Sequence, residues 1–245
     1  MAGLGAQPPP DQEGDQLPLR YELVCFDLDG TLVDTASEIC EAANLALESH
    51  GIARQPELEI THLIGAGTRE LMRRLLARCA VEQPAAARHA SAPEALFESF
   101  DRHYERTTGT RAQPYPGARA ALQRLRAAGL RVACVTNKET RHAVRVLAAT
   151  GLEAYFVLLI GGDTLAHKKP HASVLQHAMT RLAASAGRTA HVGDSWIDVA
   201  AARNAGVQAW AVGYGYNAGE PIAAAAPDQL FDSLPAVAAH ALAGR

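Results

Sequence analysis

The chain has 245 residues, 48% of them hydrophobic, and a formal net charge of −3 at pH 7. This size accommodates one core domain with an inserted subdomain, and the near balance of charges excludes a general attraction to nucleic acid or to an anionic membrane surface. No apolar stretch approaches the about 20 residues of a membrane-spanning helix, and the N-terminal residues lack the apolar segment of a signal peptide. We therefore expect neither nucleic acid nor a membrane as a partner.

The beginning of the chain differs in composition from the rest. Residues 1–18 are rich in Pro, Gln, Gly and Asp, which is typical of a disordered tail. The cysteines are scattered without the pair spacing of a metal site, and two of them lie in apolar strand patterns. They are Cys25, Cys40, Cys79 and Cys134. We interpret them as small buried residues in a reducing environment, and we expect a cytoplasmic protein.

The first predicted strand leads directly into two carboxylates. The apolar run from Leu23 to Phe26 predicts a buried strand. Asp27 and Asp29 follow two positions apart, so they can address one site at the end of the strand, where Gly30 lets the backbone turn. In parallel α/β sheets, ligands bind at this edge.

Residues 36–110 predict helices only. The predicted helices are 37–50, a short one after Pro56, 68–79 and 92–108. They separate the first strand from all later ones. We therefore expect a helical cap domain at 36–110, inserted into a core domain made of residues 19–35 and 111–245.

From residue 111 onward, strands alternate with helices. The predicted strands are 130–136, 156–160, 190–192, 207–212 and 230–231, and helices lie between them and at the C-terminus. This alternation predicts an α/β fold with a doubly wound, Rossmann-like parallel sheet as its core and an inserted all-helical cap.

Two carboxylates as close as Asp27 and Asp29 repel each other unless a cation neutralises them or one holds a proton. The chemistry that suits them is a nucleophilic carboxylate beside an acid/base carboxylate, assisted by a hard cation such as Mg²⁺. Further polar groups end later predicted strands or begin the loops beyond them. They are Thr136-Asn137, Lys169-Pro170 and Gly193-Asp194-Ser195-Trp196-Ile197-Asp198.

These motifs carry a family resemblance. Phe26-Asp27-Leu28-Asp29-Gly30-Thr31-Leu32-Val33-Asp34 resembles the first motif of the haloacid dehalogenase-like hydrolases, and in detail that of their phosphoglycolate phosphatase branch. The other three motifs occur in the order of that family, and the resemblance covers about residues 20 to 240. The second aspartate favours phosphoryl transfer, because the dehalogenase branch lacks it.

The resemblance implies roles for the phosphoryl-binding residues. Thr136, with Asn137 beside it, would bind the transferring phosphoryl group. Lys169 would stabilise its charge, although Lys168 competes for this role; the family's lysine directly precedes the proline, which favours Lys169. His171-Ala172 departs from the branch, which commonly has a second proline there.

The resemblance also implies a Mg²⁺ site. Its ligands would be the Asp27 carboxylate, the Asp29 backbone carbonyl and Asp194. Asp198 lies one helical turn beyond Asp194, so it can point back to the same site. Whether Asp198 binds the metal directly, binds it through water or orients Lys169 stays open from the sequence.

The cap offers one candidate for substrate recognition. Gly65-Ala66-Gly67-Thr68-Arg69 looks like a substrate loop that can close over the core. Arg69 is suited to clamp a carboxylate or a second phosphate. The alternative is an arginine on the surface of a helix.

We therefore predict a Mg²⁺-dependent phosphatase, a phosphoric monoester hydrolase, with 2-phosphoglycolate as the best candidate substrate. Asp27 would form an aspartyl-phosphate, Asp29 would act as acid and base, and Lys169 would stabilise charge. Alternatives are a phosphatase of a sugar phosphate or a secondary-metabolite phosphate, a phosphomutase similar to β-phosphoglucomutase, and a non-catalytic relative. The sequence leaves the exact substrate open, and it leaves monomer and homodimer equally open.

Overall fold

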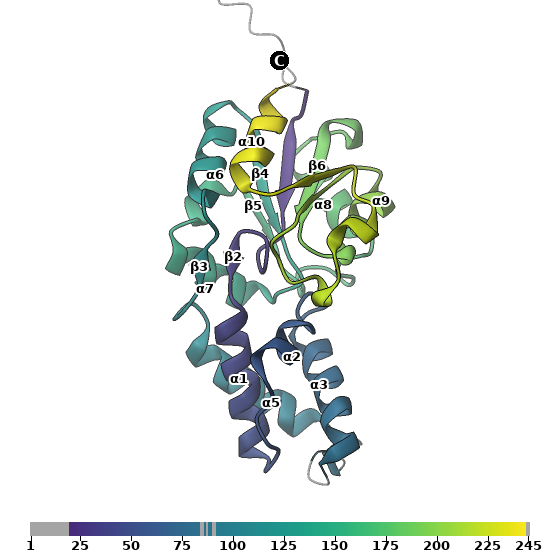
Figure 1. Ribbon diagram of the computed structural model, residues 1–245. Helices are drawn as coiled ribbons and strands as arrows, with labels where there is room; N and C mark the ends of the chain where they lie inside the picture. Colours follow the sequence, from purple (N-terminus) through teal and green to yellow (C-terminus); the bar gives the residue numbers. More distant parts are fainter. Residues whose placement is uncertain (1–19, 84–85, 87, 90–91, 244–245) are drawn as a thin grey trace, which may run out of the picture.

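The computed structural model describes residues 20–83, 86, 88–89 and 92–243, so the predicted disordered tail at 1–18 lies outside the described residues. At its centre is a six-stranded sheet in the order β5-β4-β1-β6-β7-β8, in which all paired strands run parallel (Figure 1). The strands are β1 (Leu23–Phe26), β4 (Arg131–Val135), β5 (Leu158–Ile160), β6 (Thr189–Gly193), β7 (Gln208–Val212) and β8 (Gln229–Phe231). The predicted fold class is confirmed.

Helices cover both faces of the sheet because its strands are apolar on both sides. Along β1, Leu23 and Cys25 belong to one apolar cluster, and Val24 and Phe26 belong to another. The first cluster is completed by α8 (Ser173–Arg181) and α9 (Trp196–Ala205). The second is completed by α6 (Ala118–Ala127), α7 (Thr140–Thr150) and α10 (Leu234–Leu242).

A second group of helices extends from the carboxyl end of the sheet (Figure 1). The chain leaves the sheet layer through β2 (Val33–Asp34) and returns through β3 (Gln113–Pro114), and these two short strands pair antiparallel. The helices between them are α1 (Ala36–Ser49), α2 (Glu57–Thr61), α3 (Thr68–Glu82) and α5 (Glu94–Thr107). They pack around an apolar cluster of their own.

The observed elements differ from the predicted ones mainly at their ends. β5 begins at Leu158, because Glu153–Tyr155 forms a turn of 3₁₀ helix before it, and α3 continues to Glu82. The β2–β3 ribbon was not predicted, since a strand of two residues has no readable periodicity. All four cysteines are buried, as expected. Within the described residues, no helix is both long and apolar enough to cross a bilayer.

One contact between the inserted helices and the sheet layer centres on His142 of α7. Its ring is 1% exposed and lies 4.4 Å from the ring of Tyr104 in α5. Thr108 donates its hydroxyl proton to the Tyr104 carbonyl, so His142 Nδ1 is the donor in its 3.1 Å contact with Thr108 Oγ1. Among the described residues, Nε2 has no hydrogen-bond partner. Burial, aided by the charges of Arg141 and Lys138, lowers the pKa of His142 to about 3.

The depressed pKa predicts that acid weakens the fold through His142. The pKa of His142 in the unfolded chain is about 6.5. Below that pH, His142 is protonated in the unfolded chain but stays neutral in the folded protein, so the free energy of unfolding falls as the pH decreases. Between pH 7 and pH 5, the wild-type protein should lose about 1–2 kcal/mol more unfolding free energy than His142→Gln, measured by urea unfolding. Equal losses in both proteins would contradict this assignment.

Candidate active site

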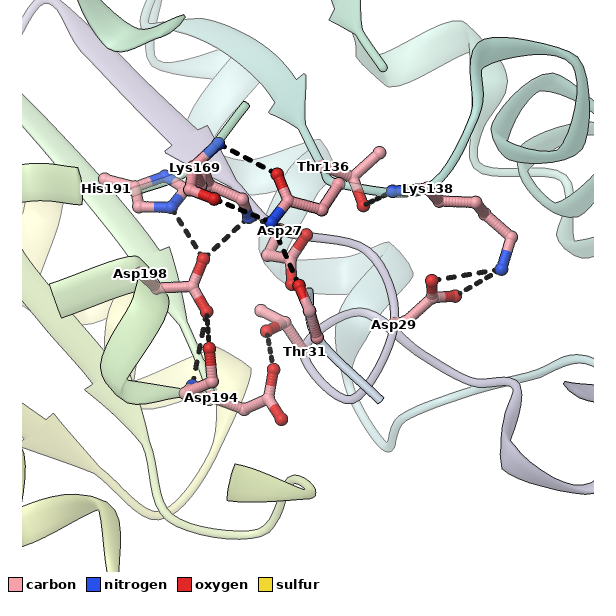
Figure 2. A network of polar contacts seen from close by, with 12 residues as sticks. Asp27, Asp29, Thr31, Thr136, Lys138, Lys169, His191, Asp194 and Asp198 are labelled. Atoms are coloured by element: carbon pink, nitrogen blue, oxygen red, sulfur yellow. Dashed lines mark hydrogen bonds and ion pairs between the residues drawn. The ribbon is translucent and has the colours of Figure 1, made fainter. Parts of the chain in front are cut away.

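Functional side chains from distant parts of the chain meet at the carboxyl edge of the sheet (Figure 2). Asp27, Thr136 and Asp194 directly follow β1, β4 and β6, and these three strands are neighbours in the sheet. Asp27 and Thr136 line a small cavity together with Asp29, with Asn137 and Lys138, and with residues of the α2–α3 loop. The sheet topology therefore brings together the motifs that the sequence analysis singled out.

Three buried carboxylates form a cluster at this edge. One oxygen each from Asp27, Asp194 and Asp198 lies within 4.8 Å of the others. Burial, and then the charges of Asp198 and Asp27, raises the pKa of Asp194 to about 8. Burial also raises the pKa of Asp27, against the opposing effect of Lys169. Such a cluster favours a bound cation.

Lys169 is the ammonium group of this cluster. Its side chain is 1% exposed, and its Nζ lies 2.8 Å from Asp27 Oδ1 and 2.6 Å from Asp198 Oδ1. Burial by itself lowers the pKa of Lys169, but the two carboxylates outweigh that effect and raise it, so the group is charged. Three carboxyl groups thus face one ammonium, and the raised pKa values of Asp27 and Asp194 reflect burial together with this excess of acidic groups.

Asp198 is saturated with hydrogen bonds from the protein itself. Its Oδ1 accepts from Lys169 Nζ at 2.6 Å and lies 3.0 Å from His191 Nε2. Its Oδ2 accepts from the backbone N–H of Ser195 at 3.2 Å and from the Ser195 hydroxyl at 2.8 Å. Asp198 belongs to the acidic cluster by distance, but this saturation favours the orientation of Lys169 over direct binding of a metal.

The carboxylate oxygens of Asp27 and Asp194 fit a divalent cation. Within the described part of the chain, Asp27 Oδ1 has no polar partner besides Lys169 Nζ at 2.8 Å. Asp194 is fixed through Oδ1 by the Thr31 hydroxyl at 2.9 Å and through Oδ2 by the Tyr216 N–H at 2.7 Å. Gly30 has φ +81° and packs so closely that a Cβ would collide with the Asp194 carboxylate. Hard carboxylate oxygens, in excess over the one ammonium group beside them, suit Mg²⁺.

The Asp29 carboxylate points away from this cluster, toward Lys138 (Figure 2). Lys138 Nζ lies 2.8 Å from Asp29 Oδ1 and 3.0 Å from Oδ2. The Thr35 hydroxyl donates to Oδ1 at 2.7 Å. The Asp29 carboxylate is therefore turned away from the acidic cluster, and a metal contact through the Asp29 backbone carbonyl stays a prediction.

The two predicted phosphoryl-binding residues differ in what their side chains do. Thr136 lines the cavity, and its hydroxyl oxygen accepts the Lys138 N–H at 3.3 Å. The Asn137 amide instead ties two loops together. Its Nδ2 donates at 3.0 Å to the carbonyls of both Gly65 and Lys169, and its Oδ1 accepts the Lys169 N–H at 2.9 Å. Asn137 thus positions Lys169 and the cap loop.

Arg69 lies outside the cavity that contains Asp27. Its side chain is exposed, and its guanidinium carbon sits 4.9 Å from the centre of the Phe97 ring in α5. It lines a neighbouring cavity of about 650 Å³, whose wall also includes Lys168 and Trp196. Lys169 also lines that neighbouring cavity, so Arg69 shares a cavity with Lys169 but not with Asp27, Asp29 or Thr136.

Sequence reasoning missed two buried residues of the site. Lys138 binds Asp29, and His191 on β6 contacts Asp198. Each had a local signal, since Lys138 follows Thr136 by two positions and His191 is a polar residue within a buried strand. Such signals mark a residue as unusual, but they do not name its partner.

Comparisons with known proteins agree with this geometry. The family model of the haloacid dehalogenase-like hydrolases matches residues 21–206. The plasmid phosphoglycolate phosphatase of Cupriavidus necator is 43% identical over 216 residues, which cover 88% of this chain and 91% of that protein. The phosphoglycolate phosphatase of Nitrosospira multiformis is 38% identical over 205 residues, with coverages of 84% and 88%.

A solved structure is similar along nearly the whole fold. The crystal structure of a predicted phosphoglycolate phosphatase from Haemophilus somnus superposes with a TM-score of 0.79 at 30% identity, and covers 89% of this chain and 96% of that one. The family model spans most of the chain, and relatives well above 30% identity align with nearly all of it. The predicted membership is therefore confirmed: this chain belongs to the haloacid dehalogenase-like hydrolases and is an enzyme similar to their phosphoglycolate phosphatases.

Proposed function

We propose that this protein is a Mg²⁺-dependent phosphatase of a small phosphate monoester, with 2-phosphoglycolate as the first candidate substrate. The observation that carries the proposal is the state of Asp27. Its buried Oδ1 lies 2.8 Å from the Lys169 ammonium group and has no further polar partner among the described residues. Such an oxygen is suited to attack phosphorus. The names of the relatives support phosphoglycolate as the substrate.

In the first step, an Asp27 oxygen attacks the phosphorus of the ester. The new bond is an aspartyl-phosphate. Asp29 takes up a proton from solvent when it leaves Lys138, and the bond from phosphorus to the leaving oxygen breaks as Asp29 gives that oxygen the proton. Lys169 and Thr136 stabilise the charge on the phosphoryl oxygens. Asp29 turns from its present contact with Lys138 to reach the leaving oxygen.

In the second step, water attacks the same phosphorus on the aspartyl-phosphate. Asp29 takes a proton from that water, the bond between Asp27 and phosphorus breaks, and inorganic phosphate leaves. Asp27 is then a free carboxylate again, and Asp29 returns to its starting state when it releases the proton to solvent and pairs with Lys138. The Asp198–Lys169 ion pair holds the ammonium beside Asp27 throughout.

The metal proposed for this site is Mg²⁺, held by the Asp27 carboxylate, the Asp29 backbone carbonyl and Asp194. When bound, it neutralises charge on the phosphoryl oxygens. The closeness of three carboxyl groups, and an Asp27 Oδ1 that has no further polar partner besides Lys169 among the described residues, support this choice.

We assign substrate selection to a cap at residues 36–110, mounted on a core of residues 19–35 and 111–245. The Asn137 bond to Gly65 joins the α2–α3 loop to the core edge. The cavity at Asp27 has about 20 Å³ of room, little more than one water needs. Substrate entry therefore requires the cap to move. Because the cavity is small when the cap is in its present position, we expect small esters to be preferred.

Replacement of the nucleophile tests the chemistry. Asp27→Asn should reduce kcat for phosphate release by at least about 10⁴-fold, because an amide cannot form the aspartyl-phosphate. The thermal unfolding curve serves as the control for folding. A purified, folded variant with near-wild-type turnover would overturn the assignment.

A matched pair of variants separates metal binding from positioning. In Asp194→Asn, the Mg²⁺ concentration for half-maximal activity should rise by more than about tenfold. In Asp198→Asn, this concentration should change little while kcat falls, because Lys169 loses a partner. Steady-state rates over a Mg²⁺ titration provide both values. A larger shift for Asp198→Asn would place the metal on Asp198 instead.

Substrate identity is tested by phosphate release from a panel of esters with and without Mg²⁺. We expect the highest kcat/KM for 2-phosphoglycolate, with activity lost on chelation by EDTA and regained with Mg²⁺. Preference for a sugar phosphate would support the alternative phosphatase. Isomerisation of a sugar phosphate without phosphate release would support a phosphomutase.

A further inference from the structure

The cavity that contains Asp27 and Asp29 also contains a cationic side chain that has no role in the proposed reaction steps. Among the described residues that line this cavity, Lys138 is the cationic one. Lys169 reaches Asp27 from outside that lining and is held between two carboxylates on the side of the acidic cluster. Any further charge on a substrate in this cavity would therefore meet Lys138.

Lys138 is built into the site as firmly as Lys169. Its side chain is 1% exposed, and its Nζ contacts both oxygens of Asp29. The same nitrogen lies 5.1 Å from the centre of the Tyr104 ring in α5, within the range of a cation–π contact. Lys138 thus joins the acid/base of the core to a helix of the cap.

The ion pair cannot persist through turnover. Asp29 must turn toward the leaving oxygen, and it cannot do so while both of its oxygens remain on Lys138. A buried ammonium that loses its partner is strongly destabilising. Another anion must replace Asp29 there, and the leaving group of the substrate is the group that arrives at that moment.

We propose that Lys138 binds an anionic leaving group, so that the carboxylate of the substrate replaces Asp29 on the ammonium and frees Asp29 for the leaving oxygen. This inference rests on the proposed phosphatase function and narrows its substrate class. In preferred substrates, a carboxylate is bonded directly to the carbon that bears the phosphoester oxygen, as in 2-phosphoglycolate. Sugar phosphates, whose leaving groups are neutral, are selected against.

Arg69 is the competing cation, and its position argues against it. Its guanidinium stacks on Phe97, in the neighbouring cavity of about 650 Å³. Lys138 shares a cavity with both catalytic carboxylates, whereas Arg69 does not. A short substrate held at Asp27 therefore presents its carboxylate to Lys138.

The test compares two esters that differ in one charge. These are 2-phosphoglycolate and 2-hydroxyethyl phosphate, in which a hydroxymethyl group replaces the carboxylate. The ratio of their kcat/KM values is measured with Mg²⁺ for the wild type, Lys138→Met, Lys138→Arg and Arg69→Met. In Lys138→Met, the ratio should fall by about 10- to 100-fold, the loss of a charge-assisted hydrogen bond. It should be largely retained in Lys138→Arg and in Arg69→Met.

The ratio separates recognition from a structural role, because misfolding or a displaced Asp29 slows both esters alike. Equal losses on both esters in Lys138→Met would reduce Lys138 to a positioning residue for Asp29 and overturn the inference. If the ratio of kcat/KM values fell in Arg69→Met and not in Lys138→Met, Arg69 would be the residue that binds the carboxylate, and the inference would be overturned.

The wild-type rates distinguish a failure of the Lys138 inference from a failure of the proposed phosphatase function. Equal hydrolysis of both esters would leave the phosphatase function standing and overturn the inference, whatever the variants do. No Mg²⁺-dependent hydrolysis of either ester would overturn the proposed function, and the inference with it.

Discussion

The site depends on one buried ammonium group. Lys169 Nζ stands between Asp27 and Asp198, and without it three carboxylates would be buried close together with no compensating charge. Loss of one partner from a buried ion pair is strongly destabilising, so the arrangement requires every member. The hydrogen bonds of Asp198 fix the lysine, and those of Asn137 hold the loop that carries it. The ammonium opposes the rise in the pKa of Asp27 that burial causes, while the Asp27 oxygen stays buried beside it.

The parallel sheet makes this concentration of charge possible. β1, β4 and β6 are adjacent, and each ends at the same edge, so residues separated widely in the chain become neighbours. The strands themselves are buried on both faces, which confines polar groups to their ends. The N-terminal turn of α9 then returns Asp198 to the cluster, while Ser195 satisfies its second oxygen.

A second ion pair links the sheet to the inserted helices. Lys138 follows β4, contacts Asp29 after β1 and lies over Tyr104 of α5. Tyr104 in turn packs on His142 of α7. The catalytic carboxylates are thus divided between two environments. Asp27 belongs to an acidic cluster, while Asp29 belongs to an ion pair beside the inserted helix α5. This division supports the proposed roles, in which Asp27 is the nucleophile and Asp29 turns as the acid and base.

Local patterns in the chain were sufficient to predict the alternation of strands and helices, the helical insertion, and the placement of Asp27, Thr136 and Asp194 at strand ends. Each of these follows from hydrophobic periodicity and chain order. Tertiary structure alone decided which charges meet. The Lys138–Asp29 pair joins residues 109 positions apart, Asp198 is saturated by neighbours from three segments, and Arg69 turns to Phe97. Side-chain direction and hydrogen-bond saturation depend on packing in three dimensions, and no one-dimensional pattern encodes them.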